Sequence, residues 1–409
     1  MNHSRVQRFI DGQRAEMIRL VQEWSDINSG SFHIEGLARM RDRLLEDFAV
    51  LEVPPRLFDL PPATIVDERG RDVPRPLGQC ISWRGNPDAP FQVLLAIHYD
   101  TVFPAEHPFQ KTRWRDAATL RGPGVVDAKS GIAIIRTIAR ALGQSPLGDR
   151  IGWEIFLNSD EEVGSPGSAP LLHERASRYD LGLLFEPALP DGSLVGARKG
   201  AGGFTIVIHG RAAHVGREFA AGRSAIHRAA RLVTELETLN ADPRLTVNVG
   251  RIDGGGPTNV VADLAVVRFN IRAEDGEALG YTRAKLNELV EVIDGEDGFR
   301  ARLHGDFSSP PKPFENGTAE LFEAIAGCAA EQGVRLRHKP TGGVCDGNKL
   351  AGAGLPNIDT LGGRGGGAHS DHEFLVVDSL TERARLVTSL LLGIAAGEIP
   401  WRWGRASRN

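Results

Sequence analysis

Residues 91–100 read FQVLLAIHYD, a mostly apolar run that ends in a histidine, a tyrosine and an aspartate. A short apolar run of this kind is typical of a buried strand. Residues 130–142 (SGIAIIRTIARAL) have helical periodicity, and residues 151–158 (IGWEIFLN) and 181–185 (LGLLF) are two further strand-like runs. This alternation predicts an α/β fold with a mostly parallel sheet and helices on both faces.

The pattern changes in the middle of the chain. It predicts a strand, a helix, two strands, a helix and a strand over residues 203–209, 224–240, 245–252, 259–272, 277–293 and 299–305. This β-α-β-β-α-β order is that of a ferredoxin-like α+β unit. The proline-dense stretch SSPPKP at 308–313 marks the end of the unit.

The C-terminal part returns to the first pattern, with a helix expected at 321–332, a strand at 355–361 and an amphipathic helix at 379–396. We therefore predict that residues 1–198 and 310–409 form one discontinuous α/β domain. The ferredoxin-like unit, residues 199–309, is expected to be inserted into that domain.

The composition argues against several classes of protein. Among 409 residues, 48 are lysine or arginine and 53 are aspartate or glutamate, which gives a net charge of −5. Without a basic excess we expect no nucleic-acid partner. No run approaches the ~18 apolar residues of a membrane span. The three cysteines suit neither a disulfide framework nor a zinc knuckle. We therefore expect a cytoplasmic protein that does not associate with membranes.

Potential metal ligands follow four of the expected strands. They are His98 and Asp100, Glu161 and Glu162, Glu186, and His369. In open α/β sheets, ligands bind outside the carboxyl ends of the strands, so these side chains are expected to meet at one edge of the sheet. Asp127, in the glycine-rich segment GPGVVDAKSG before a helix, is a further candidate.

Each of these segments has an ordinary explanation when it is taken alone. Asp127 suits a helix N-cap, the stretch NSDEEVG at 158–164 suits an acidic surface turn, and His98 with Asp100 suits a solvated loop. Metal chemistry explains the whole set better. Two histidines and three carboxylates can hold two divalent ions if one carboxylate bridges them, and a nearby free carboxylate can then accept a proton from water.

Motifs for other chemistries are absent or weak. The stretch GRGGGA at 363–368 is similar to a dinucleotide fingerprint, but it comes late in the chain and no βαβ unit with a terminal acid follows it. The sequence contains neither a Walker A motif nor the G-x-S-x-G elbow of serine hydrolases.

Five motifs occur in an order that resembles a known superfamily. They are HYDTVFP (98–104), GPGVVDAKSGI (122–132), NSDEEVGSPGS (158–168), LLFEPALPDGSLVGARKG (183–200) and GAHSDHEF (367–374). The chain resembles the dizinc aminoacylase, acetylornithine deacetylase and succinyl-diaminopimelate desuccinylase superfamily of metallopeptidases. Within it, the chain is most similar to the glutamate carboxypeptidase (glucarpidase) branch, and the similarity covers nearly the whole chain.

The resemblance implies two Zn²⁺ ions per subunit. By position, His98 and Glu186 are implied ligands of one ion and Glu162 and His369 of the other, with Asp127 as the bridging carboxylate. Co²⁺ or Mn²⁺ could occupy the same ligands.

The resemblance also implies catalytic and substrate-binding residues. Glu161 corresponds to the general base, and Asp100 to the residue that orients His98. His214 corresponds to a histidine that family members present to the active site of a partner subunit, which implies a homodimer formed through the inserted domain. Asn259 and Arg272 match positions that hold the substrate and its free carboxylate. Arg272 suits that role physically, because a guanidinium group pairs with a carboxylate through two hydrogen bonds.

We therefore expect a dizinc amidohydrolase of carboxypeptidase type. It would cleave the amide bond of a C-terminal or N-acylated amino acid with a free carboxylate in a small molecule or short peptide, by attack of a metal-bridging hydroxide. Glutamate is a possible preference, although Cys345 to Asn348 lie in a region that tunes substrate choice in the family. The alternatives are an N-acyl amino acid deacylase or dipeptidase on the same fold, and a non-catalytic metal- or peptide-binding protein.

Overall fold

The structure is a computed structural model, and it describes residues 4–404. Its main sheet has six strands in the order β1 (Arg56–Asp59), β4 (Gln79–Gly85), β8 (Ile151–Asn158), β5 (Phe91–His98), β9 (Leu181–Leu184) and β16 (Asn357–Ile358). Strands β8, β5, β9 and β16 run parallel to one another, and β4 runs antiparallel to both β8 and β1. The sheet is therefore mostly parallel with an antiparallel strand that the sequence analysis did not predict, and the strand expected at 355–361 is shorter.

Helices cover both faces of this sheet. They are α1 (Ser4–Gly12), α2 (Arg14–Ser25), α3 (Ile34–Phe48), α4 (Ser130–Leu142), α5 (Ala169–Ala176), α9 (Asn316–Glu331), α10 (Asp346–Gly352) and α11 (Ser379–Ala396). Alternate residues of β5 face two different cores, because successive side chains of a strand point to opposite sides. Val93, Leu95 and Ile97 join the larger core with α2, α4 and α11, whereas Leu94 and Ala96 pack with residues of α5.

Two smaller sheets connect distant parts of the chain. One has the order β17 (Arg364–Gly366), β18 (Phe374–Val376), β7 (Thr119–Arg121) and β6 (Arg113–Trp114), and all its pairs are antiparallel. The other pairs β10 (Leu194–Arg198) with β15 (His338–Thr341) in parallel. The first of these sheets places the loop at 367–373 beside the segment that follows β7. Among the described residues, no helix is long and apolar enough to cross a membrane.

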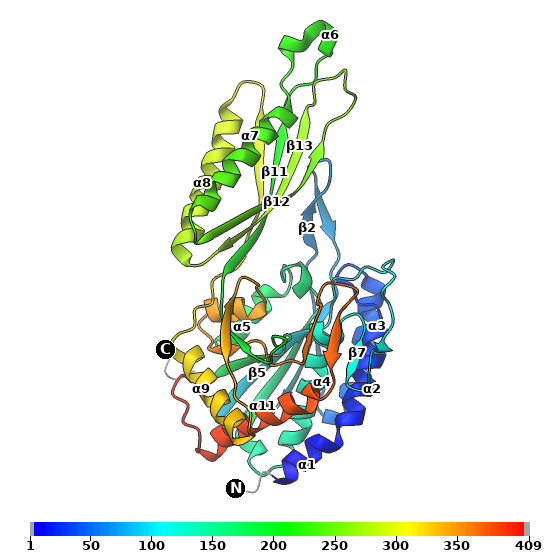
Figure 1. Cartoon of the computed structure of the whole chain (residues 1–409), viewed down its shortest axis with the longest axis vertical. Helices are drawn as coiled ribbons and strands as arrows, with labels where there is room; N and C mark the ends of the chain where they lie inside the picture. Colours follow the sequence, from blue (N-terminus) through cyan, green and yellow to red (C-terminus); the bar gives the residue numbers. More distant parts are fainter. Residues whose placement is uncertain (1–3, 405–409) are drawn as a thin grey trace.

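The inserted part forms a separate layer at the upper end of the molecule (Figure 1). Its antiparallel sheet has the order β12 (Leu245–Gly254), β13 (Leu264–Ala273), β11 (Gly200–His209) and β14 (Arg300–Ser309). The helices α7 (Ala225–Thr238) and α8 (Gly276–Gly295) pack on one face around a core that includes Phe204, Ile208 and Leu232. The expected β-α-β-β-α-β order is therefore present.

A hairpin reaches from the lower part of the molecule to this upper sheet (Figure 1). It consists of β2 (Ala63–Val66) and β3 (Asp72–Arg75), and its turn contains Gly70 with a φ of +72°. Arg268 on β13 donates hydrogen bonds to the carbonyl oxygens of Val66 (3.1 Å) and Asp67 (2.8 Å). A Cβ added at Gly70 would lie 2.5 Å from Val207 Cγ1, so only glycine allows this close approach. The hairpin thus links the two parts of the chain in addition to the two covalent connections.

We expect the substitution Arg268→Ala to loosen the hairpin. It leaves two carbonyl oxygens without their donor, which should lower the free energy of unfolding by about 1–2 kcal/mol. Amide hydrogen exchange should become faster across residues 63–75. Arg283→Ala is the matched control, because Arg283 pairs with Asp306 on the inserted sheet and makes no hydrogen bond to the hairpin. Equal exchange rates in the two variants would contradict the proposed link.

Candidate active site

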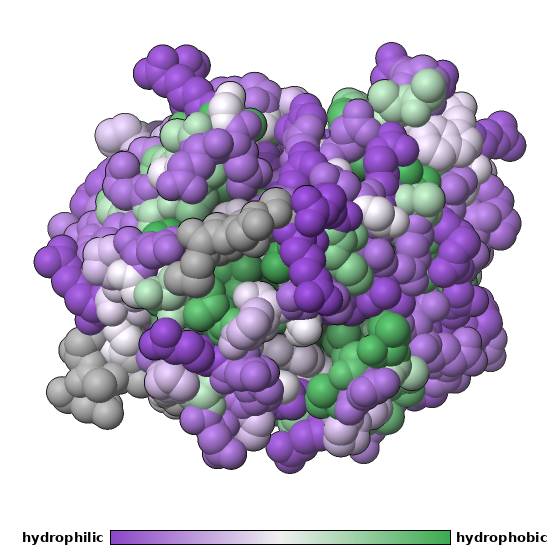
Figure 2. Space-filling view, turned by 90° about the horizontal axis from the view of Figure 1, so that it is seen from below, coloured by the Kyte–Doolittle hydropathy of each residue, from purple (hydrophilic) through white to green (hydrophobic). Residues whose placement is uncertain are grey.

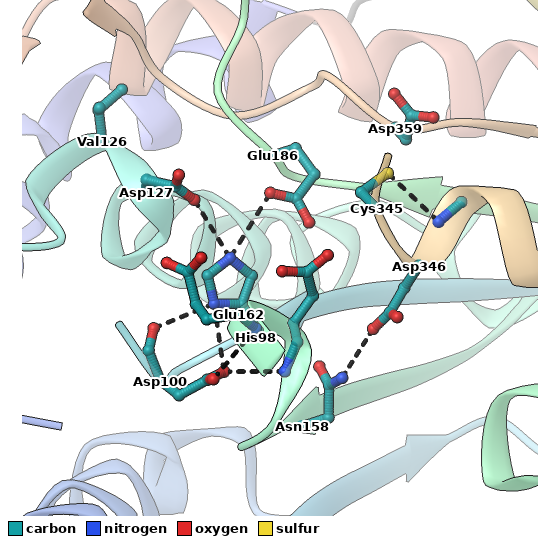
Figure 3. Close-up of polar contacts among 12 residues, drawn as sticks. His98, Asp100, Val126, Asp127, Asn158, Glu162, Glu186, Cys345, Asp346 and Asp359 are labelled. Atoms are coloured by element: carbon teal, nitrogen blue, oxygen red, sulfur yellow. Dashed lines mark hydrogen bonds and ion pairs between the residues drawn. The ribbon is translucent and has the colours of Figure 1, made fainter. Parts of the chain in front are cut away.

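The candidate ligands come together at the carboxyl ends of the strands. His98 is the last residue of β5, Glu162 lies in the turn after β8, and Glu186 follows β9. Figure 3 shows the side chains of Asp127, Glu162 and Glu186 around the ring of His98. His369 lies in the loop between β17 and β18, with a φ of +62°, and its ring reaches the same carboxylates.

The carboxylate of Asp127 lies between two histidines. Its Oδ1 is 3.2 Å from His98 Nε2, and its Oδ2 is 3.3 Å from His369 Nε2. Each histidine has a second carboxylate partner: Glu186 Oε2 is 3.6 Å from His98 Nε2, and Glu162 Oε2 is 3.1 Å from His369 Nε2. The site thus contains two groups, each with one imidazole and one terminal carboxylate, which share Asp127.

Asp100 connects the two strand ends that carry His98 and the acidic turn. Its carboxylate accepts hydrogen bonds from the backbone N–H groups of Glu161 and Glu162, both at 3.2 Å, and from the Ser31 hydroxyl at 2.7 Å. The Nδ1 atom of His98 is 3.0 Å from the backbone carbonyl oxygen of Asp100 and 3.4 Å from its carboxylate. Asp100 therefore contacts His98 through its backbone as well as its side chain, and it leaves His98 Nε2 facing Asp127.

The sequence analysis missed Glu373, which holds the segment that contains Asp127. Its carboxylate accepts hydrogen bonds from the backbone N–H groups of Gly124, Val126 and Asp127 at 2.9–3.0 Å. Burial raises the pKa of Glu373 to about 8, and the charge of Asp127 adds to the effect. Glu373 is the penultimate residue of the quoted motif GAHSDHEF, but nothing in the local pattern separated it from an ordinary surface acid.

Arg198 is a second residue to which the sequence analysis gave no role. It is buried, and its guanidinium group makes two hydrogen bonds of 2.8 Å to the carboxylate of Asp359, which also accepts one of 2.6 Å from Lys312. Arg198 lines a cavity of about 280 Å³ together with Asp127, Glu186 and the turn after β8. It therefore places a positive charge beside the cluster of carboxylates.

The crowded charges shift the pKa values of the candidate ligands. Burial raises the pKa of Glu161 well above its ordinary value, and the charge of Glu186 adds to the effect. Burial and the charge of Asp127 raise the pKa of Glu162 to about 7. Hydrogen bonds to Asp127 and Glu162 raise the pKa of His369 to about 11. Such a site contains more negative charge than a protein interior tolerates without a cation or protons.

The three expected substrate-binding residues lie in the inserted part. His214 caps the short helix α6 (Val215–Glu218), and the carbonyl oxygen of Asn259 accepts a hydrogen bond from Val215 N–H. Helix α6 is at the upper tip of the molecule, far from the strands that carry the acidic cluster (Figure 1). Arg272 is near the other end of the inserted sheet, opposite Ala201 of β11. Within one chain, the structure does not bring His214 or Asn259 to the cluster.

The donor set suits a divalent metal ion. Ligand atoms of His98, Asp127 and Glu162 lie within 4.8 Å of one another. Imidazole nitrogen and carboxylate oxygen are ligands that Zn²⁺, Co²⁺ and Mn²⁺ accept. The histidines, the shared carboxylate and the raised pKa values of the acids all fit a site that a cation completes.

Comparisons with known proteins agree with this geometry. A family model for a peptidase dimerisation domain matches residues 196–298, and one for peptidase family M28 matches residues 81–206. Carboxypeptidase G2 from Pseudomonas sp. (strain RS-16) is 29% identical over 327 residues, which cover 75% of this chain and 74% of that protein.

Solved structures share the fold. A tripeptidase from Staphylococcus aureus superposes with a TM-score of 0.75 at 21% identity, covering 94% of this chain and 99% of the other. The YXEP protein of Bacillus subtilis, described as a dinuclear metal binding peptidase from the M20 family, has a TM-score of 0.62 at 16% identity, covering 94% of this chain and 99% of the other.

The α/β sheet, the cluster of histidines and carboxylates at its strand ends and these matches identify a metal-dependent hydrolase. The chain is similar to carboxypeptidase G2 over 75% of its length and to models of peptidase domains over two shorter ranges, and its activity is that of a peptidase.

We expect metal binding to release protons and to weaken as the pH falls. In the metal-free protein the pKa values of His369 and Glu162 are raised, so both side chains carry protons near neutral pH. A cation must displace these protons, and its affinity should fall about tenfold per pH unit for each proton displaced. Calorimetry with Zn²⁺ from about pH 6 to about pH 8, in buffers of different ionisation enthalpy, counts the protons released. An affinity that does not change with pH would contradict this expectation.

Proposed function

We propose that this chain is a dizinc carboxypeptidase-type amidohydrolase. It would cleave the amide bond between an acyl group or peptide and an amino acid whose carboxylate is free. The observation that carries the proposal is the position of Asp127, whose two oxygen atoms face His98 and His369 separately. A single shared carboxylate between two ligand groups is the arrangement that a pair of metal ions requires.

The proposed ligands follow these two groups. His98 and Glu186 would hold one Zn²⁺, Glu162 and His369 would hold the other, and Asp127 would bridge them. When bound, the ions supply Lewis acidity, which polarises the scissile carbonyl group and makes water more acidic. Co²⁺ or Mn²⁺ would satisfy the same oxygen and nitrogen donors.

Glu161 is the proposed general base. It lies next to Glu162 in the turn after β8 and lines the cavity, but it makes no ion pair with either histidine among the described residues. Its carboxylate is therefore free to take a proton from water and pass it to the leaving amine. The pKa of Glu161 is raised by burial, which makes it a better proton acceptor than an exposed glutamate.

Arg272 is the proposed partner of the substrate carboxylate. Its Nη1 atom is buried and has no hydrogen-bond partner among the described residues. Arg272 as a whole is half-buried, but a buried N–H donor without an acceptor is costly, and a substrate carboxylate would satisfy it. Arg272 lies opposite Ala201, three residues after Arg198 of the cavity, so it belongs to the end of the inserted sheet that is nearest the site.

The inserted part is proposed as a dimerisation domain, with boundaries at residues 199 and 309. Because His214 and Asn259 lie at its far tip, they would act on the active site of a partner subunit in a homodimer. His214 would then donate a hydrogen bond to the oxyanion that forms during attack. Asn348 donates hydrogen bonds to the carbonyl oxygens of Lys199 (3.0 Å) and Pro310 (2.7 Å), one on each connection, and so holds the junction between the two domains.

A preference for glutamate as the leaving amino acid is a finer proposal. It rests on the resemblance of the sequence motifs to the glutamate carboxypeptidase branch, whereas the names of the relatives, carboxypeptidase G2 and probable carboxypeptidases, support carboxypeptidase activity. Cys345 lines the cavity and is buried, so the chemistry around it would contribute to the choice of substrate.

The substitution Glu161→Gln should reduce kcat by about 10²–10⁴-fold. The amide keeps the shape of the side chain but cannot accept a proton from water, and the five proposed ligands remain intact. Turnover is measured with a panel of N-acyl-glutamate, N-acyl-ornithine and dipeptide substrates on Zn²⁺-loaded protein, and metal content is measured by mass spectrometry. Wild-type activity in a variant with full metal content would refute the assignment of the base. No hydrolysis of any substrate by the metal-loaded wild-type protein would refute the function.

The substitution Arg272→Met should raise KM about 10- to 100-fold for a substrate with a free carboxylate. The same substrate with its carboxylate converted to an amide should bind poorly to both proteins and show little difference between them. Arg300→Met, at an exposed position on β14, is the control for a lost arginine on the same sheet. If Arg272→Met lowers kcat/KM equally for the acid and the amide, Arg272 does not bind the carboxylate.

A further inference from the structure

A second cavity lies outside the candidate active site. It has a volume of about 760 Å³ and is lined by residues of α1, the end of α9, the segment 334–337 and α11. None of its lining residues belongs to the cavity that contains Asp127 and Glu186. The helices that line it are at the lower end of the molecule in Figure 1, and Figure 2 views that end as a largely hydrophilic surface with hydrophobic residues gathered near its middle.

The cavity contains more arginines than carboxylates. The arginines are Arg335, Arg337, Arg364, Arg383 and Arg385, and the carboxylates are Asp191, Glu331 and Glu382. Two of the three acids already have partners, because Glu382 pairs with Arg364 at 3.0 Å and Asp191 pairs with Lys339 at 2.5 Å.

Three of the arginines have no ion pair within residues 4–404. Arg385 pairs with Asp11, which lies outside the cavity, but no carboxylate of the described chain pairs with Arg335, Arg337 or Arg383. Glu331 is the one lining acid left to offset them. The cavity therefore has an excess of positive charge.

Arg383 is the buried member of this group. Its side chain is 4% exposed, and its Nη2 donates one hydrogen bond of 2.8 Å to the carbonyl oxygen of Gly192. Burial lowers the pKa of Arg383 to about 10; the charge of Glu382 opposes this shift, and the positive charge of Arg364 adds to it. A guanidinium group with five N–H donors is costly to bury, and this one has a single hydrogen bond to protein and no ion-pair partner among the described residues.

Apolar side chains form another part of the wall. Ala329 and Leu386 are buried there, and Val334 is 52% exposed. An inorganic ion would use the arginines but leave this surface bare. A ligand with an apolar body and several anionic oxygen atoms would contact both.

We propose that this cavity is a binding site for a small organic anion that has at least two negative charges. Phosphate and carboxylate groups both suit the arginines, since a guanidinium group pairs with either through two hydrogen bonds. The volume is that of a small-molecule site, and its position among three helices and a loop favours a compact ligand over an extended polymer.

The test titrates the Zn²⁺-loaded protein with ADP and, separately, with citrate, without added Mg²⁺, which would neutralise two charges of either anion. Calorimetry measures affinity, and metal content is checked after each titration. Binding of ADP would indicate a phosphate ligand, and binding of citrate would indicate a polycarboxylate. Adenosine, which is ADP without its charged phosphate groups, tests whether the uncharged part binds by itself. At least one anion should bind the wild-type protein, whereas adenosine should not.

Two variants locate the binding site. Arg335→Glu with Arg337→Glu reverses two exposed charges and should weaken binding about tenfold or more without affecting the fold. Arg383→Gln should have at least that effect, and its circular dichroism shows whether it is folded. Arg39→Glu, an exposed position on α3, is the control for a changed net charge and should bind normally. The proposal is overturned if neither anion binds at millimolar concentration, or if the double variant binds as tightly as Arg39→Glu. Hydrolytic activity is measured separately, so a failure here leaves the proposed function untouched.

Discussion

The structure depends on a concentration of negative charge at the carboxyl end of its main sheet. Asp127, Glu161, Glu162 and Glu186 line one small cavity, and the histidines His98 and His369 lie among the same carboxylates. Four carboxylates cannot all be ionised in such a space unless positive charge accompanies them. The raised pKa of Glu162 and the raised pKa of His369 are two results of this constraint in the metal-free protein. A bound divalent metal ion offsets the negative charge, so fewer of these side chains have to carry a proton. Metal binding and protonation therefore compete.

Much of the surrounding architecture holds these charges in place. The carboxylate of Glu373 accepts hydrogen bonds from three backbone N–H groups at and before Asp127, and that of Asp100 accepts them from the N–H groups of the acidic turn. Arg198 is itself fixed by Asp359, which Lys312 also contacts. Each of these contacts joins segments that are far apart in the chain. A site made in this way is rigid, because moving one ligand would break hydrogen bonds to buried groups.

The inserted domain is linked to this site by few contacts. Two covalent connections pass through the junction, where Asn348 binds the backbone of both. The β2–β3 hairpin adds polar contacts: Arg268 binds its backbone, and Glu68 and Asp72 pair with Arg251, Arg302 and His304 of the inserted sheet. His214 and Asn259 are at the opposite end of the domain. If they take part in the reaction, as we propose, they do so across a dimer. A rotation at the junction would then change the distance between the two halves of the site.

Residue patterns along the chain were enough to predict the fold class, the insertion of a β-α-β-β-α-β unit and the strand ends at which the acids and histidines gather. These features follow from local periodicity and from the geometry of parallel sheets, which places strand ends at one edge. These patterns did not reveal the antiparallel strand at 79–85 or the reduction of the expected strand at 355–361 to two residues. Both features depend on which strands become neighbours in the sheet, and the residues within one short segment do not determine its neighbours.

How Asp127 is shared between two histidines, and which residues support it, depends on the packing of the folded chain. The contact between Glu373 and the segment around Asp127 spans 246 to 249 positions, and no pattern in a short window distinguishes Glu373 from a surface glutamate. The burial of Arg198 and the separation of His214 from the acidic cluster are decided in the same way. Hydrogen bonds and charges act through space, so their partners are set by packing rather than by order in the chain.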